Sequence, residues 1–240
     1  MRLVNEMPVI KSVKHRGLVG ETDRLVGGVG GVEFVNADCV DVCVGLSREG
    51  RGARVGLLNM ASERCPGGGV RHGAKAQEEE ICRRTTLYRT LAAVDGGYPL
   101  AFDEIVYSPG VVVVKDARGR RLAESDRATI DVLSSAAIRR PDVVETAGEG
   151  SRFRHASDRE TMRLKIRILL QTAERHGLNS LVLGAWGCGA FANPVEDVAR
   201  LFAEELAHVT SIRVIFAILD MPDRRPLFAR FRDTFASFHV

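Results

Sequence analysis

From Val32 onward, the chain alternates short apolar runs with longer stretches in which apolar residues recur every three or four positions. The first pattern is typical of buried strands and the second of helices that pack on one side. Strands are predicted over 32–36, 54–60, 129–133, 181–183 and 212–219. Helices are predicted over 40–49, 73–93 and 158–176, from about Pro194, and over 226–238. This alternation predicts a layered α/β domain with a mixed or mostly parallel sheet.

Three segments depart from this alternation. Residues 104–107 and 111–115 are both rich in strand-forming residues and flank a Ser-Pro-Gly turn, which predicts a hairpin or two closely linked strands. Residues 141–156 are polar and contain glycine, so a loop is predicted there. Residues 1–31 are poorly patterned and end in a glycine-rich run. They are predicted to form an N-terminal extension before a domain of residues 32–240.

Composition and charge narrow the class of protein. The 34 basic and 31 acidic side chains leave a net charge of +3, too balanced for non-specific nucleic-acid binding. Basic clusters at 83–84 and 118–121 are expected on a solvated face. The five cysteines include no CxxC pair, which argues against zinc and fits a reducing compartment. No apolar run has the length of a signal peptide or membrane span, so a soluble cytoplasmic protein is expected.

Two glycine-rich loops each follow a predicted strand and precede a helix. In the first, Gly67, Gly68 and Gly69 lack Cβ atoms, so backbone N–H groups can approach an anion. The second, residues 184–191, matches neither a Walker loop nor the GxGxxG dinucleotide pattern. The first loop alone is better explained as a flexible turn. Together they predict a phosphate-rich ligand, such as a diphosphate, at the carboxyl ends of the strands.

A run of carboxylates follows the first loop. Gln77 and three successive glutamates, Glu78, Glu79 and Glu80, begin the predicted helix. Acidic residues in a first helical turn are favoured by the helix dipole, whatever their function. Successive helical residues also point in different directions, so one or two carboxylates can face the loops. Burial and neighbouring charges raise a carboxyl pKa, as glycosidic general acids require.

These features together resemble the microbial-type poly(ADP-ribose) glycohydrolase family, whose motif is three glycines, six to eight residues, and then Gln-Glu-Glu. Here Gly67, Gly68 and Gly69 are followed by seven residues and then by Gln77, Glu78 and Glu79. Further similarity lies in 58–62, 73–79, 82–83, 87–88, 107–109, 183–189, 193–194 and 216–220. The resemblance implies a three-layer macrodomain-like α/β fold. It also implies hydrolysis of the ribose–ribose O-glycosidic bond of ADP-ribose chains, with release of ADP-ribose.

The resemblance assigns chemistry to the Gln-Glu-Glu motif. Glu79 would protonate the departing ribose oxygen and then take a proton from the incoming water. This differs from the usual scheme with two carboxylates. Glu78 would hold ribose hydroxyls, Gln77 would support the site, and Glu80 would lie on the surface. No metal or organic cofactor is implied.

The resemblance also assigns residues that bind the terminal ADP-ribose unit. The first loop would lie against the diphosphate and distal ribose, and Phe191 would orient that ribose. Asn59 would bind a ribose and Asp38 the adenine. The loop residues are Gly67, Gly68, Gly69 and Val70 in the first loop, and Gly187, Cys188, Gly189 and Ala190 in the second.

The implied partners are poly(ADP-ribose) and ADP-ribosylated proteins, in the reversal of ADP-ribosylation, for example after DNA damage. ADP-ribose is the expected product and ligand. The protein is not expected to bind a membrane or to recognise a nucleic-acid sequence. Three alternatives stay open. The chain could remove single ADP-ribose groups, bind ADP-ribose without catalysis, or be another kind of nucleotide-binding module. The Gln-Glu-Glu motif favours chain cleavage, because plain macrodomains lack it.

Overall fold

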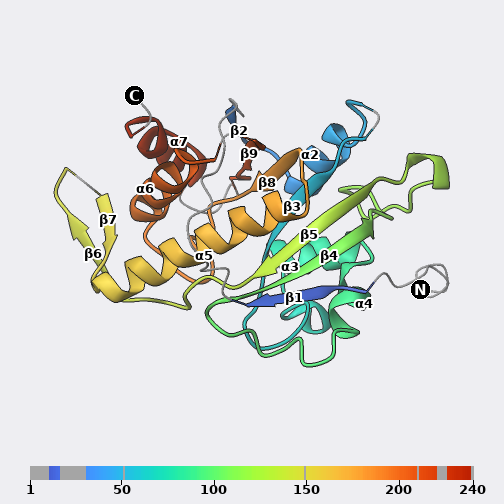
Figure 1. The fold of residues 1–240 in the computed structure, drawn as a ribbon, viewed down its shortest axis with the longest axis horizontal. Helices are drawn as coiled ribbons and strands as arrows, with labels where there is room; N and C mark the ends of the chain where they lie inside the picture. The colour runs from blue at the N-terminus through green and yellow to red at the C-terminus, as the bar shows by residue number, and fades with distance from the viewer. Residues whose placement is uncertain are drawn as a thin grey trace.

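A computed structural model describes residues 11–16, 31–50, 52–148, 150–209, 211–220 and 226–238. Its centre is a seven-stranded sheet in the order β1-β4-β5-β3-β8-β9-β2 (Figure 1). The strands are β1 Val13–Arg16, β2 Val32–Val35, β3 Val55–Met60, β4 Glu104–Val112, β5 Thr129–Ser135, β8 Ser180–Leu183 and β9 Arg213–Ala217. Strands β5, β3, β8, β9 and β2 run parallel, while β4 is antiparallel to β5 and β1. The predicted mixed, mostly parallel sheet is confirmed.

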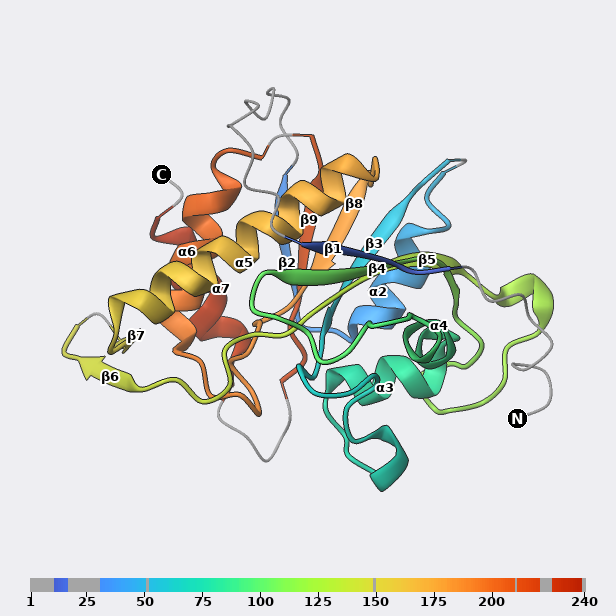
Figure 2. The ribbon, with the colours of Figure 1, turned by 60° about the horizontal axis from the view of Figure 1, so that its bottom comes forward.

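Helices cover both faces of the sheet and make three layers (Figures 1 and 2). One face carries α5 Ala156–Arg175, α6 Val195–Leu206 and α7 Phe228–Ala236, and the other carries α2 Cys39–Leu46, α3 Gln77–Arg84 and α4 Leu87–Ala92. Successive strand residues point to opposite faces, so Leu57 joins the core beneath α2 and α3 while Leu58 joins the core beneath α5 and α6. The apolar runs predicted as buried strands therefore serve two cores. Within the described ranges, no helix is long and apolar enough to cross a membrane.

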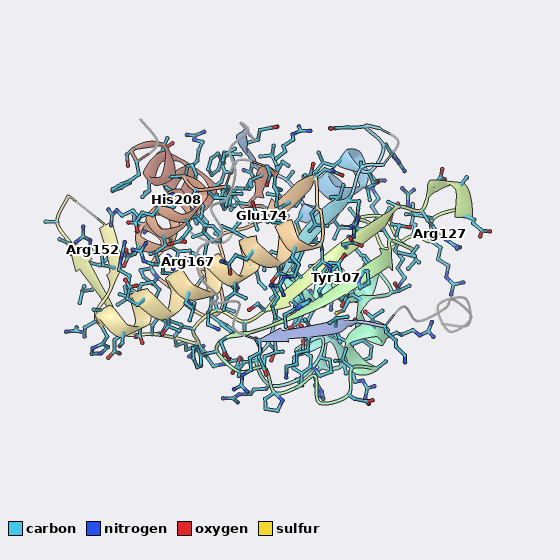
Figure 3. The ribbon with its side chains drawn as sticks, viewed as in Figure 1. Tyr107, Arg127, Arg152, Arg167, Glu174 and His208 are labelled. Carbon is cyan, nitrogen blue, oxygen red and sulfur yellow. The ribbon has the colours of Figure 1, made fainter. Side chains whose placement is uncertain are left out.

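The predicted hairpin at 104–115 is wrong, because residues 104–112 form one strand, β4, with an irregularity between Ser108 and Val111. The irregularity is held by Asp131 on β5, whose Oδ1 accepts the Gly110 N–H at 2.9 Å. Asp131 Oδ2 also accepts the hydroxyl of Tyr107 at 2.7 Å. Figure 3 shows the place of Tyr107 on the sheet. A cross-strand carboxylate thus satisfies a backbone donor that the bulge removes from the ladder.

The single helix predicted over 73–93 is also wrong, because Thr85 separates α3 from α4. The Thr85 hydroxyl donates to the Ile81 carbonyl and accepts the Leu87 N–H, so one side chain closes the first helix and opens the second. The Thr85 backbone is extended and forms a bridge with Val113 next to the sheet. A helical apolar period continues across the break, which is why periodicity did not reveal it.

Two other predictions missed short strands. The expected loop at 141–156 contains a separate hairpin of β6 Val143–Thr146 and β7 Gly150–Phe153. Within the expected N-terminal extension, Val13–Arg16 forms the edge strand β1. Residues 1–10 and 17–30 lie outside the described residues. Each of these three strands is four residues long and lacks a continuous apolar run, so its stability comes from pairing rather than from local pattern.

Candidate active site

Both glycine loops lie at the carboxyl edge of the parallel strands. The first loop leaves β3 after Met60 and enters α3, and the second leaves β8 after Leu183 and enters α6. Since β3 and β8 are adjacent and parallel, both loops emerge on the same side of the sheet. The expected convergence of the two loops is present.

The first loop turns tightly over the start of α3. Gly67 and Gly68 have positive φ values of 71° and 52°, which side chains with a Cβ rarely adopt. A Cβ on Gly68 would lie 2.6 Å from Glu79 Oε1 and 2.9 Å from Glu78 Oε2. The loop therefore needs glycine both for its backbone conformation and for the close approach of two carboxylates. Val70 follows in a short 3-10 turn and packs against the core beneath α3.

Glu78 is buried under this loop, with 3% of its surface exposed. Its Oε2 accepts the Ser62 N–H at 2.7 Å, and its Oε1 accepts the Gly67 N–H at 3.2 Å and the Asn59 amide at 3.4 Å. Burial raises the pKa of Glu78 to about 7, and the Glu79 charge adds to the rise, against these hydrogen bonds. The carboxyl with the raised pKa is thus Glu78, which the sequence resemblance assigns to holding ribose hydroxyls.

Glu79 is also buried, but it faces the outer part of the loop. Its Oε1 accepts the Gly69 N–H at 2.8 Å, and its Oε2 accepts the Ala76 N–H at 2.9 Å, closing the first turn of α3. Two fixed backbone donors therefore orient the carboxylate beside Gly68. Glu80, expected on the surface, has a side chain that is 42% exposed and pairs with Arg83.

Gln77 and Asn59 connect the carboxylates to the sheet. Gln77 accepts the Met60 N–H at 2.8 Å and donates to the Leu58 carbonyl at 2.7 Å, so it anchors α3 to the end of β3. Asn59 is fully buried and donates to Ser134 Oγ at 3.0 Å. Its Oδ1 accepts no hydrogen bond from any described residue. A buried side-chain acceptor without a hydrogen-bond partner is uncommon in folded proteins.

The second loop is shaped by Gly187 and Asn193. Gly187 has a φ of 78°, and the Asn193 amide donates to the carbonyls of Ile138, Gly187 and Phe191. Gly189 and Ala190 are exposed, and a Cβ on Gly189 would meet nothing within 4 Å. Cys188 packs against the core beneath α6. Gly189 therefore leaves open space in front of the loop.

Arg139 is a site residue that the sequence analysis missed. Its guanidinium lies 4.3 Å from the centre of the Phe191 ring, within the range of a cation–π contact. The same group donates to both carboxylate oxygens of Glu63, at 2.6 Å and 3.0 Å. Glu63, Arg139 and Phe191 belong to three different loops, so nothing in their sequence spacing connects them.

Asp38 lies at the same edge, after β2. Its Oδ1 caps α2 by accepting the N–H groups of Val40 and Asp41, and it pairs with Arg84 at 2.7 Å. Arg84 is 2% exposed and also pairs with Asp41. The prediction of a solvated face at 83–84 is therefore wrong for Arg84, which joins α3 to α2. Among the described residues, no cluster of three His, Cys, Asp or Glu side chains could hold a metal ion.

Comparison with known proteins identifies one family by its sequence and the same family by its structures. The family described as microbial-type PARG, catalytic domain, matches residues 13–116. The crystal structure of poly(ADP-ribose) glycohydrolase from Thermomonospora curvata superposes with a TM-score of 0.75 and 30% identity, covering 95% of this chain and 85% of that chain. The same enzyme bound to the inhibitor ADP-HPD gives a TM-score of 0.76 and 31% identity, covering 93% and 85%.

A second organism provides a similar match. The glycohydrolase from Deinococcus radiodurans in complex with ADP-ribose gives a TM-score of 0.75 and 30% identity, covering 88% of this chain and 86% of that chain. A comparison with curated protein sequences returned no match. The identity over most of both chains, together with the three-layer fold and the glycine and carboxylate loops, shows that this chain belongs to the microbial-type poly(ADP-ribose) glycohydrolase family.

Proposed function

We propose that this chain is a poly(ADP-ribose) glycohydrolase, which hydrolyses the ribose–ribose O-glycosidic bond of ADP-ribose chains and releases ADP-ribose. The observation that carries the proposal is the pair of buried carboxylates, Glu78 and Glu79, packed against Gly68. Family membership supports the same reaction. In the cell, the enzyme would act in the cytoplasm on ADP-ribosylated proteins and reverse their modification.

Glu79 is proposed as the catalytic acid and base. The N–H groups of Gly69 and Ala76 hold its carboxyl at the loop, which supplies the fixed orientation that proton transfer requires. Protonated Glu79 would donate to the departing ribose oxygen as the glycosidic bond breaks and an oxocarbenium-like carbon develops. The resulting carboxylate would then take a proton from the water whose oxygen bonds to that carbon. Each turnover thus restores the protonated acid.

The remaining site residues are proposed to bind the terminal ADP-ribose unit. The 67–70 and 187–190 loops would hold the diphosphate, whose charge also stabilises the oxocarbenium-like carbon. Glu78 and the free Oδ1 of Asn59 would hold ribose hydroxyls. Phe191 would pack on the distal ribose, and Asp38 would bind the adenine. All of these residues lie within 32–240, which we propose as the catalytic domain. Residues 1–31 precede it as an extension that contributes the edge strand β1 to its sheet.

The test replaces each of two adjacent glutamates by glutamine. Glu79→Gln keeps the shape of the side chain but removes the transferable proton, so turnover should fall about 100- to 10,000-fold while ADP-ribose still binds. Glu80→Gln is the matched control and should behave like the parent. Both variants are incubated with auto-modified poly(ADP-ribose) and with a mono-modified protein, and the released products are resolved.

Near-normal release of ADP-ribose from chains by Glu79→Gln would refute the proposed acid. If the parent releases ADP-ribose only from the mono-modified protein, its activity is instead the removal of single ADP-ribose groups. Binding without any release by the parent would make the protein a reader of ADP-ribose.

A further inference from the structure

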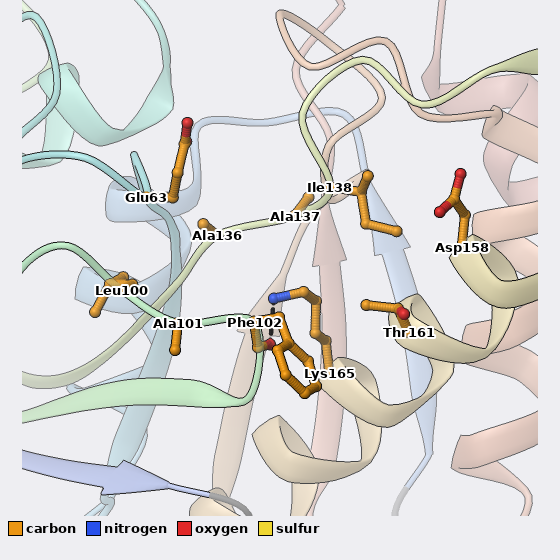
Figure 4. A pocket seen from close by; sticks show the side chains of 10 residues that line it. All are labelled: Glu63, Leu100, Ala101, Phe102, Ala136, Ala137, Ile138, Asp158, Thr161 and Lys165. Carbon is orange, nitrogen blue, oxygen red and sulfur yellow. Dashed lines mark hydrogen bonds between the residues drawn. The ribbon is translucent and has the colours of Figure 1, made fainter.

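A cavity of about 310 Å³ lies between α5 and the segments before β4 and after β5, and Figure 4 shows the residues that line it. One side of it is apolar and is formed by Leu100 and Ala101 before β4 and by Ala136, Ala137 and Ile138 after β5. The other side is polar and is formed by α5. The volume is at the lower end of the range for small-molecule sites. None of the residues assigned above to the terminal ADP-ribose unit lines this cavity.

The polar side is a stripe of three residues on one face of α5. Asp158, Thr161 and Lys165 are separated by three and four positions, a spacing that places them above one another along the helix. The Thr161 hydroxyl donates to the Ser157 carbonyl, which leaves its oxygen free to accept. The stripe therefore offers both acceptors and a donor to the cavity.

Lys165 is the donor, and it is 95% buried, with 5% of its surface exposed. Among the described residues, its ammonium makes one hydrogen bond, to the Phe102 carbonyl. An ammonium has three N–H groups, so two remain available. Burial lowers the pKa of Lys165 to about 8, with the Asp103 charge opposing the fall, so the ammonium predominates at neutral pH. A buried ammonium with unused donors is costly unless a ligand or water supplies acceptors.

The cavity adjoins the proposed catalytic centre through Glu63. This carboxylate lines the cavity and holds Arg139, whose guanidinium stacks on Phe191. Ile138 also lines the cavity, and its carbonyl accepts the amide of Asn193 in the second glycine loop. The cavity therefore lies on the side of the site where Phe191 would hold the distal ribose.

We propose that this cavity binds the adenine of the penultimate ADP-ribose unit, the group that leaves with the ribose oxygen when the chain is cut. The proposal rests on the proposed function, since the scissile bond joins the distal ribose to the adenosine of the preceding unit. That adenosine is the first group beyond the bond. The cavity would make the enzyme prefer chains over single ADP-ribose groups.

The charges at the cavity favour a neutral base over a phosphate. Lys165 contributes one positive charge and Asp158 one negative charge, while Arg139 neutralises Glu63. An anion therefore gains no net attraction there. Adenine carries ring nitrogens that accept from Lys165, an amine that donates to Asp158, and flat faces that pack against Leu100 and Ile138.

The test measures affinity for ADP-ribose and for its dimer, two units joined by the scissile bond, in the Glu79→Gln background. The dimer should bind about tenfold more tightly, a size typical of one hydrogen bond to a charged group. Lys165→Met or Asp158→Asn should remove this preference and leave ADP-ribose affinity unchanged. Glu160→Gln is the matched control, because its side chain lies on α5 but is 65% exposed. Unchanged ADP-ribose affinity also shows that each variant is folded.

A direct measurement titrates adenosine and, separately, pyrophosphate into protein already saturated with ADP-ribose. Binding of adenosine that Lys165→Met abolishes supports the proposal. Binding of pyrophosphate alone, of neither, or of adenosine equally to the Lys165→Met variant overturns it, as does a dimer preference that survives in both cavity variants. These outcomes are separate from the proposed function, which fails when the parent releases no ADP-ribose from chains or when Glu79→Gln turns over normally.

Discussion

Replacement of Gly68 by alanine places a methyl group against both carboxylates of the candidate active site. The new Cβ would lie 2.6 Å from Glu79 Oε1, whereas an ordinary contact begins at about 3.4 Å. The oxygen must therefore withdraw by about 0.8 Å, or the loop must move by a similar amount. Glu79 cannot rotate freely, because Gly69 and Ala76 hold its two oxygens. The substitution should thus misplace the proposed acid.

The expected effects have two separable parts. Alanine at the Gly68 φ of 52° costs about 1–2 kcal/mol of stability, which lowers Tm by roughly 2–8 °C in a chain of this size. A displacement of about 1 Å in a catalytic group costs on the order of a hundredfold in rate. Turnover should consequently fall far more than stability does.

Gly73→Ala is the matched control. Gly73 also has a positive φ, 78°, but a Cβ there would meet nothing within 4 Å. It should show the same loss of Tm with near-normal turnover. Thermal unfolding, calorimetric titration of ADP-ribose and initial rates on chains are measured for both variants. Equal loss of turnover in the two variants, or normal turnover in Gly68→Ala, would contradict the assignment of Glu79 to the reaction.

Two other substitutions are tested with the same measurements, and a pH dependence is tested by urea unfolding. Gly189→Ala should weaken ADP-ribose binding with unchanged Tm, because its Cβ meets only the space proposed for the ligand; unchanged affinity would make this loop a simple turn. Phe191→Leu should reduce turnover about a hundredfold with little change in ADP-ribose affinity or Tm, whereas matched losses of stability and rate would mean core packing. The pKa of Glu78 is about 7 in the folded protein and 4.5 in the unfolded chain, because the fold disfavours the charged carboxylate. The free energy of unfolding should therefore fall as the pH rises from about 4.5 to 7. This loss of stability is at most roughly 3 kcal/mol. Urea unfolding at pH 5 and pH 8 should show it in the parent but not in Glu78→Gln. The same change in unfolding free energy between the two pH values in both proteins would disprove it.

The sequence by itself determined the parallel strands of the central sheet and the outline of the site. Near-continuous apolar runs identify β3 and β8, because strands buried on both faces are apolar at most positions. The three glycines and the Gln-Glu-Glu motif are close in sequence, so one loop and one helical turn suffice to bring Gly68 to Glu79. Local pattern therefore carried the most specific part of the chemistry.

Only the tertiary structure decided the contacts between distant segments. The β4 bulge depends on Asp131 across the sheet, and β1 exists as a strand because β4 offers it an edge. Arg139 reaches Phe191 from another loop, and Lys165 becomes buried because α5 crosses the sheet near Phe102. Sequence periodicity reports which face of an element is buried, but not which distant side chain it meets, because that depends on how the layers pack.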